Sequence, residues 1–278
     1  MASENQHTDE ERAILEYLQR AAETGNADEM ELLLSGPAKK YMDTYCGGAT
    51  LLYIAARYGH ASVVELLVRY GSKAMDSSNF GGVSPIHGAA RGGHDEVVKL
   101  LVRLGSTTID TPSALGVTPL FSAAESGNAS TVETLVRLGS RVVDAPSGVW
   151  RHTPMYMAAK HGNVLVIESL VRLKSKTIDT PDSEGFTPLH VATEYGHVKA
   201  IEALVRFGSK ALDTPDETGD TPFEISKICG YTECKNVLIA LNDKIIDSTV
   251  VNEDYRQGVR FRVFFSWSLV KKLLFSLD

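Results

Sequence analysis

A short phrase built around Thr-Pro recurs along the chain at a nearly constant interval, and this spacing constrains the fold more than any other feature. Looser copies begin at Thr50 and Ser84 and clear copies at Thr118, Thr153, Thr187 and Thr221, so the steps are 34, 34, 35, 34 and 34 residues. A period of about 33 residues is typical of stacked arrays, in which each repeat buries its apolar face against its neighbours. Such arrays form long surfaces rather than deep pockets, so binding is the first function to consider.

One copy predicts a pair of helices. Thr187 can cap a helix with its hydroxyl, Pro188 suits the first helical position, and His190 can bond back to the cap. Gly196 marks a turn and Gly208 ends a second helix, because glycine adopts the left-handed conformation readily. The apolar face of the second helix is expected to comprise Val198, Ile201, Leu204 and Val205.

This order of Thr-Pro-Leu-His, Gly-His, a second helix and a Gly-containing turn closely resembles the ankyrin repeat, from about Asp28 to Lys244. The resemblance implies an all-α solenoid of six to seven stacked helix-turn-helix repeats with projecting β-turn fingers. It also implies a non-enzymatic protein-interaction module: an adaptor, an inhibitor or an effector scaffold. Fold alone does not decide function, since ankyrin arrays serve many partners.

Two departures from the family pattern have structural consequences. The usual Gly-Ala-Asp after the second helix is replaced by Gly-Ser. Lys174 stands where the other repeats have Gly71, Gly105, Gly139 and Gly208. A non-glycine residue in a left-handed geometry costs on the order of 1 kcal/mol, so we expect either local weakening there or a different helix end.

The repeats predict three segments. Residues 1–46 are expected to form an N-terminal capping helix pair, 47–245 the tandem repeats, and 246–278 a linker and apolar tail. The tail, Phe261–Leu277, is shorter than the ~20 residues that span a bilayer and contains Lys271 and Lys272. Three alternatives remain open for it: a cap on the array, an interfacial membrane or partner-docking helix, and a disordered tail. Membrane association through this tail is the alternative to a purely protein-binding function.

The amino-acid composition limits which classes of partner and which compartment are expected. The 278 residues include 28 Lys and Arg against 35 Asp and Glu, a formal net charge of −7, so no basic excess favours nucleic acid. Cys46, Cys229 and Cys234 are few and widely placed, which indicates reduced thiols. With no apolar run in the first twenty residues, we expect a cytoplasmic monomer, or a protein of the host cytoplasm if it is a secreted effector.

The sequence shows no catalytic, cofactor or metal-binding constellation. His87 and His190 occupy the Thr-Pro-x-His position and are interpreted as structural. The same holds for the Gly-His turn residues His60, His94 and His197, whereas His152 and His161 are expected at the surface. An arginine ends each second helix, which permits either binding of an anionic partner or pairing with the helix dipole and nearby acids.

Positions that differ between copies are the candidates for partner binding, because a shared framework with local variation suits a readout surface. They lie in the fingers and at the ends of the first helices, on the predicted concave face: Tyr58, Phe80, Arg91, Leu115, Trp150, Arg151, Lys160, His161, Phe186 and Tyr195. Trp150 lies in the finger with an inserted residue, and Trp and Arg are frequent in binding hot spots. Packing of Trp150 against a neighbouring finger is the alternative. Charge is graded, from Arg57 and Arg91 early to Glu184, Glu194, Glu217 and Asp220 late.

Overall fold

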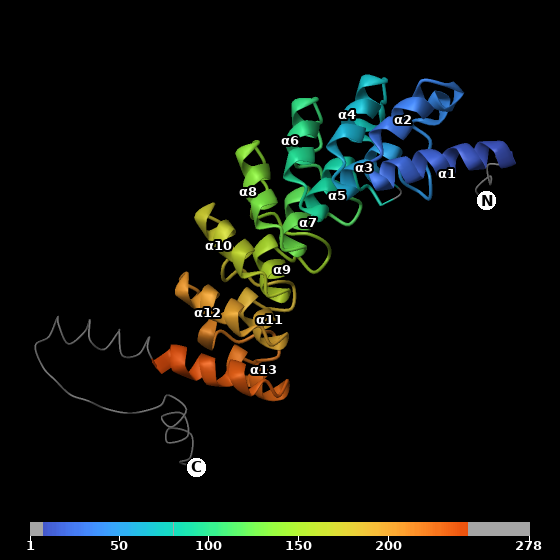
Figure 1. Cartoon of the computed structure of the whole chain (residues 1–278). Helices are drawn as coiled ribbons and strands as arrows, with labels where there is room; N and C mark the ends of the chain where they lie inside the picture. The colour runs from blue at the N-terminus through green and yellow to red at the C-terminus, as the bar shows by residue number, and fades with distance from the viewer. Residues whose placement is uncertain (1–7, 80, 244–278) are drawn as a thin grey trace, which may run out of the picture. The chain divides into compact units, whose positions relative to one another are not determined.

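The computed structural model describes residues 8–79 and 81–243, and its regular elements over these residues are helices, which confirms the all-α prediction (Figure 1). The chain divides into two units, Met1–Leu238 and Ile239–Asp278. The first unit contains the repeats and the candidate site. Phe80 and the apolar tail Phe261–Leu277 lie outside the described residues.

The helices of the first unit form two rows (Figure 1). The first row comprises α1 (Asp9–Thr24), α3 (Leu51–Tyr58), α5 (Pro85–Gly92), α7 (Pro119–Glu125), α9 (Pro154–Lys160), α11 (Pro188–Glu194) and α13 (Pro222–Ile228). The second row comprises α2 (Ala27–Leu34), α4 (Ala61–Arg69), α6 (Asp95–Arg103), α8 (Ala129–Arg137), α10 (Val164–Arg172) and α12 (Val198–Arg206). Each helix from α1 to α12 contacts its partner in the other row, and neighbouring helices within each row are also in contact. Residues 232–243 form a helix after α13.

Short 3₁₀ turns and loops connect the repeats. The turns are Pro37–Tyr41, Ala74–Asp76 and Ala211–Asp213. We call each loop that leads from a second-row helix to the next first-row helix a finger. The backbones of neighbouring fingers are joined at three places: Ala114 N donates to Gly81 O at 2.9 Å, Ser183 N to Trp150 O at 3.0 Å, and Glu217 N to Glu184 O at 3.2 Å.

Each first-row helix from α3 onward begins at the recurrent Thr or Ser, as predicted. The Thr187 hydroxyl accepts the His190 amide at 3.4 Å, and the Thr187 amide donates back to His190 Nδ1 at 3.2 Å. His190 Nε2 then donates to the carbonyl of Asp220, 3.2 Å away in the next repeat. The residue therefore caps its own helix and joins two repeats, which confirms its structural role.

The turns between paired helices hold a second set of contacts between repeats. The imidazole Nε2 of His94 lies 2.9 Å from Arg57 O, and that of His197 lies 3.0 Å from Lys160 O. Gly59, with φ +85°, precedes this contact, and a Cβ there would lie only 2.5 Å from His94 Nδ1. Glycine is required at this turn both for the backbone angle and for the close approach of the next repeat.

The Gly-Ser departure is explained by a third set of contacts. After every second-row helix from α4 onward, a serine donates its hydroxyl to an aspartate of the preceding repeat: Ser72 to Asp43, Ser106 to Asp76, Ser140 to Asp110 and Ser175 to Asp144 at 2.6 Å, and Ser209 to Asp179 at 2.5 Å. A hydrogen bond to an ionised acceptor is about twice as strong as a neutral one. The substitution therefore gives five successive boundaries between repeats a charge-assisted bond.

Lys174 adopts the left-handed conformation with φ +63°. Helix α10 ends at Arg172, the arginine that also ends the other second-row helices after α2. Of the two expectations for this position, the different helix end is therefore wrong, and the backbone strain is present.

The buried face of the second-row helices is centred slightly differently from the prediction. In α12 the buried residues are Ala200, Ile201, Ala203 and Leu204, whereas Val198 and Val205 are half-buried. Alanine is small enough to let α10 and α12 approach closely, so Ala200 and Ala203 are part of the buried face. The prediction counted only large apolar side chains and therefore centred the face one position away.

Candidate partner-binding surface

The predicted binding residues lie at finger tips and at the ends of first-row helices. The apolar and aromatic ones are markedly exposed: Tyr58 by 52%, Leu115 by 75%, Trp150 by 52% and Tyr195 by 46%. Arg91, Arg151 and His161 are exposed, and Lys160 and Phe186 are half-buried. We call the exposed side of the fingers and first-row helices the finger surface.

The finger that carries Trp150 has its own local structure. Ser147 N donates to His152 O at 2.8 Å and closes an isolated β-bridge around the inserted residue. Arg151 adopts φ +58° at the position where Gly82, Gly116, Gly185 and Gly219 have positive φ in the other fingers. The Trp150 carbonyl accepts the Ser183 amide of the next finger, while its side chain stays half-exposed. The Trp150 backbone is thus bonded to the next finger, while half of the residue remains exposed.

Asp182 anchors the next finger and contacts the Trp150 finger. Its Oδ1 accepts the amides of Glu184 at 2.9 Å and Phe186 at 3.0 Å, and its Oδ2 lies 3.6 Å from His152 Nε2. The His152 ring stacks on Tyr156 at 4.3 Å between centroids and with an angle of 6° between planes. His152 was expected at the surface, but its side chain is only 22% exposed because it lies against Asp182.

The electrostatics of this cluster favour a structural role. Burial lowers the pKa of His152, which outweighs the opposing effect of Asp182, and Lys160 lowers it further. Burial and then the nearby Asp182 carboxylate strongly raise the pKa of Tyr156. A tyrosine with a raised pKa keeps its proton, so Tyr156 is a hydrogen-bond donor and packing group rather than a nucleophile.

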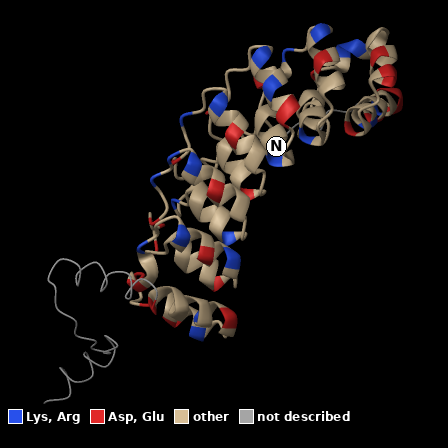
Figure 2. Ribbon diagram, turned by 60° about the vertical axis from the view of Figure 1, so that its left-hand side comes forward, with Lys and Arg blue, Asp and Glu red and all other residues tan. Residues whose placement is uncertain are grey.

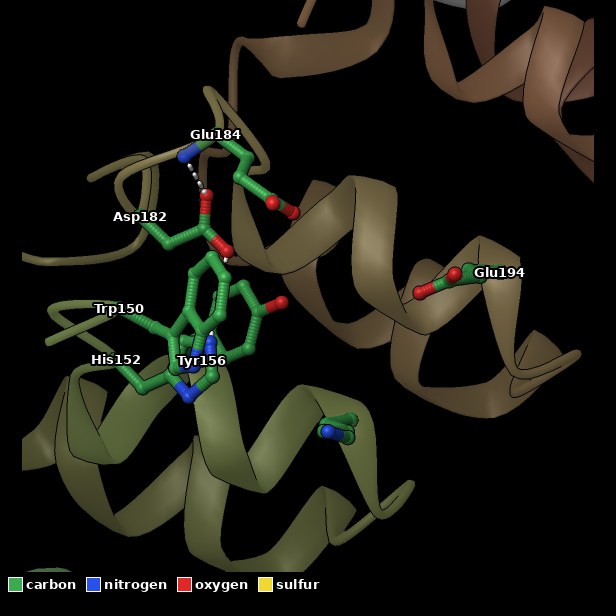
Figure 3. A pocket seen from close by; sticks show the side chains of 7 residues that line it. Trp150, His152, Tyr156, Asp182, Glu184 and Glu194 are labelled. Carbon is green, nitrogen blue, oxygen red and sulfur yellow. Dashed lines mark hydrogen bonds and ion pairs between the residues drawn. The ribbon is translucent and has the colours of Figure 1, made fainter. Parts of the chain in front are cut away.

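A pocket of about 250 Å³ opens between α9 and α11. One wall is formed by Trp150, His152 and Tyr156, and the other by Asp182, Glu184 and Glu194 (Figure 3). Lys160 completes the lining from the last turn of α9. Its ammonium group lies 5.3 Å from the centroid of the Tyr195 ring, within the range of a cation–π contact.

The structure brings together only part of the predicted set. Trp150 and Lys160 line one pocket, and Lys160 links it to Tyr195. Tyr58, Arg91 and Leu115 lie on earlier repeats and do not line it.

Five pocket residues are absent from the predicted set. Glu184 and Glu194 entered the sequence analysis only through the charge gradient, and His152, Tyr156 and Asp182 were not linked to binding at all. The signal for Tyr156 was its place in the Thr-Pro-x-His position, where it replaces a histidine. No comparable signal marked Asp182, because aspartate is an ordinary turn residue.

The arginines of the second row pair mainly with acids of the preceding repeat. Arg69 lies 2.6 Å from Glu31, Arg206 lies 2.8 Å from Glu168, and Arg172 pairs with Glu133. Figure 2 shows both signs of charge distributed along the stack. Arg137 lies 4.0 Å from Glu133 of its own helix. Pairing with acids thus accounts for Arg69, Arg137, Arg172 and Arg206, and because these side chains are exposed each pair contributes little to stability.

The part of the chain that the structure describes shows neither a metal site nor a membrane-spanning helix. Over residues 8–79 and 81–243, no group of three His, Cys, Asp or Glu side chains is arranged to hold a metal ion. Among the same residues, no helix combines the length and apolar character needed to cross a membrane.

Comparison with solved structures supports the fold. The chain is similar to the ankyrin repeat domain of human ASB11, with a TM-score of 0.69 and 19% identity over 81% of this chain and 96% of that one. It is also similar to a chain in the complex of the predatory endopeptidase Bd0816 from Bdellovibrio bacteriovorus with the immunity protein Bd3460. That match has a TM-score of 0.60 and 24% identity over 68% of this chain and 96% of that one. No curated protein matches the sequence.

A family model provides the assignment. The model for ankyrin repeats, three copies long, matches residues 18–112, 72–145, 138–214 and 155–250. Ankyrin repeats generally mediate protein–protein interactions, and their fold is typically non-enzymatic. Because these matches cover most of the residues and agree with the stacked helix pairs, the chain belongs to the ankyrin-repeat family.

Proposed function

We propose that this protein is a non-enzymatic interaction module that holds a protein partner on its finger surface, as an adaptor, an inhibitor or an effector scaffold. The observation that carries the proposal is the location of the exposed aromatic and apolar side chains. Tyr58, Leu115, Trp150 and Tyr195 all lie at positions where the repeats differ from one another. Large apolar and aromatic side chains that remain exposed on one surface are typical of recognition sites.

The framework around these positions supports the same interpretation. Capping threonines, turn histidines or asparagines and the Ser–Asp pairs recur from repeat to repeat and hold the array together. The side chains of the finger surface take no part in these bonds, which use only backbone carbonyls there, such as those of Arg91 and Lys160. Its residues are thus available to vary without loss of the stacking contacts.

Backbone strain at Arg151 adds support from an independent direction. A non-glycine residue at φ +58° costs on the order of 1 kcal/mol, and the other fingers avoid this cost with glycine. Strained residues cluster at functional sites, where the side chain justifies the strain. Arg151 is exposed beside Trp150, and this pair of residue types is enriched in binding hot spots.

The test is a quantitative pull-down from cell lysate with the wild-type protein and the triple variant Trp150→Ala/Arg151→Ala/Tyr58→Ala. Arg137→Ala/Arg206→Ala, on the second row, is the matched control for lost exposed side chains. We expect the triple variant to lose a captured protein by about 30-fold, as hot-spot truncations do, and the control to keep it. Helical content is compared by circular dichroism. Equal capture by all three proteins contradicts the proposed surface.

A further inference from the structure

The pocket between α9 and α11 contains acceptors that the fold itself does not use. Asp182 is only 4% exposed and is occupied by two backbone amides and His152. The carboxylates of Glu184 and Glu194 are exposed, and neither forms a hydrogen bond or ion pair with other described residues. Both line the same pocket (Figure 3). The pocket thus presents two free carboxylates to a ligand.

The ammonium group of Lys160 does not neutralise the negative charge of these carboxylates. Three carboxylates and one ammonium line the pocket, a formal charge of −2 when His152 is neutral. Lys160 directs its ammonium group to the Tyr195 ring rather than forming an ion pair with Glu184 or Glu194. A ligand that enters here meets a net negative potential.

The remaining wall of the pocket is aromatic. The Trp150 indole is half-exposed at the pocket edge, next to the stacked rings of His152 and Tyr156. An indole face attracts cations more strongly than other aromatic rings do. Free carboxylates opposite an exposed indole form a complementary environment for a planar cation.

We propose that this pocket binds the guanidinium group of an arginine side chain on the protein partner. This assignment rests on the proposed function and specifies which chemical group of the partner is recognised. Arginine fits better than lysine because its planar guanidinium can stack on Trp150 while its donors form paired hydrogen bonds with Glu184 or Glu194. Lysine would offer a single, more strongly hydrated point charge.

The charges of the pocket predict opposite effects for two substitutions. Glu184→Gln replaces a charged, two-oxygen acceptor with a neutral amide and should weaken arginine binding by about 10-fold, the typical loss of a charge-assisted bond. Lys160→Gln removes a like charge and should strengthen the same binding. The matched control is Glu125→Gln. Glu125, at the end of α7, lies outside the pocket, so Glu125→Gln removes the same charge without changing the lining.

The experiment titrates the full chain with acetyl-Gly-Arg-Gly-amide and follows the indole N–H resonance of Trp150 by NMR, assigned with Trp150→Phe. The uncharged citrulline peptide tests for the guanidinium charge, and the corresponding lysine and glutamate peptides test for the chemical class. We expect the arginine peptide to bind at least about 10-fold more tightly than the citrulline peptide. Circular dichroism confirms that each variant is folded.

Several outcomes overturn the assignment. Equal binding of arginine and citrulline peptides, or no shift of Trp150, excludes guanidinium recognition. Binding of the glutamate peptide that is lost in Lys160→Gln shows that the pocket takes an acidic group instead. A response of Glu184→Gln no larger than that of Glu125→Gln removes the pocket from recognition. Because the titration needs no partner, its failure refutes only the arginine assignment, and the pull-down still decides the finger surface.

Discussion

The hydrogen bonds between Ser and Asp of neighbouring repeats lead to a prediction about stability, and the chain contains a residue that serves as the control. Asp76 and Asp213 each end a 3₁₀ turn of the same form, Ala74–Asp76 and Ala211–Asp213. Asp76 accepts the Ser106 hydroxyl at 2.6 Å, the Thr107 hydroxyl at 2.8 Å and the Thr107 amide at 3.1 Å. Asp213 forms no hydrogen bond or ion pair with other described residues. Asp213→Ala therefore reports the local effect of the substitution alone.

The difference between the two alanine variants measures the bonds between repeats. Burial alone would raise the pKa of Asp76, but the bonds from Ser106, Thr107 and Thr108 together lower it, so the carboxylate is charged at neutral pH. Hydrogen bonds to charged groups contribute roughly 1.5–3 kcal/mol each. Thr107 is exposed and its bonds compete with water, so we count the Ser106 bond fully and the others weakly, about 3 kcal/mol in all.

The assay is urea unfolding followed by circular dichroism for the wild type, Asp76→Ala and Asp213→Ala. We expect Asp76→Ala to lower the free energy of unfolding by about 3 kcal/mol more than Asp213→Ala. A double-mutant cycle with Ser106→Ala isolates the interaction free energy between Asp76 and Ser106. A difference below roughly 1 kcal/mol, the scatter of ordinary surface substitutions, would refute the idea that these bonds hold neighbouring repeats together.

Two further predictions concern backbone strain and pH. Lys174→Gly should raise the free energy of unfolding by about 1 kcal/mol because it removes a side chain from the left-handed region, whereas Lys174→Ala should give no comparable gain; thermal unfolding compares them. Burial lowers the pKa of His87 and His190 below the ordinary value of 6.5, so their neutral forms stabilise the fold fully above that pH and this stability is lost as the pH falls below it. Urea midpoints at pH 7.5 and 5.5 measure the loss, and a His87→Gln variant with an unchanged pH dependence would contradict the assignment to His87.

The fold was predictable because its signals are local and repeated. A Thr cap, a following proline and a glycine turn each specify a chain direction within a few residues, and their period shows that the units stack. The Ser–Asp bonds were not predicted, although both residues recur. Their pairing depends on the distance between one repeat and the next, and the sequence of a single repeat does not specify that distance.

The site was predictable only where a residue differs from its counterparts in other repeats. Trp150 and Lys160 stand out in such a comparison, and the structure places both in one pocket. Asp182 does not stand out, because aspartate or asparagine also occupies this finger position in other repeats, where it bonds to its own backbone. What distinguishes Asp182 is that its second oxygen faces His152 of the previous repeat. That contact depends on stacking and on the inserted residue beside Trp150.

The bonds that hold the array together join equivalent positions in consecutive repeats. Asp76 pairs with Ser106, and Asp110 pairs with Ser140, each 30 residues further along the chain. If the sequence is cut at the same point in two repeats and one whole repeat is removed or duplicated, the same Ser–Asp pairs therefore form again at the junction. The molecule can be lengthened or shortened in units of one repeat without new chemistry at the junction. Recognition can thus be altered by exchanging modules, whereas a single excised repeat would lose the contacts on both of its sides.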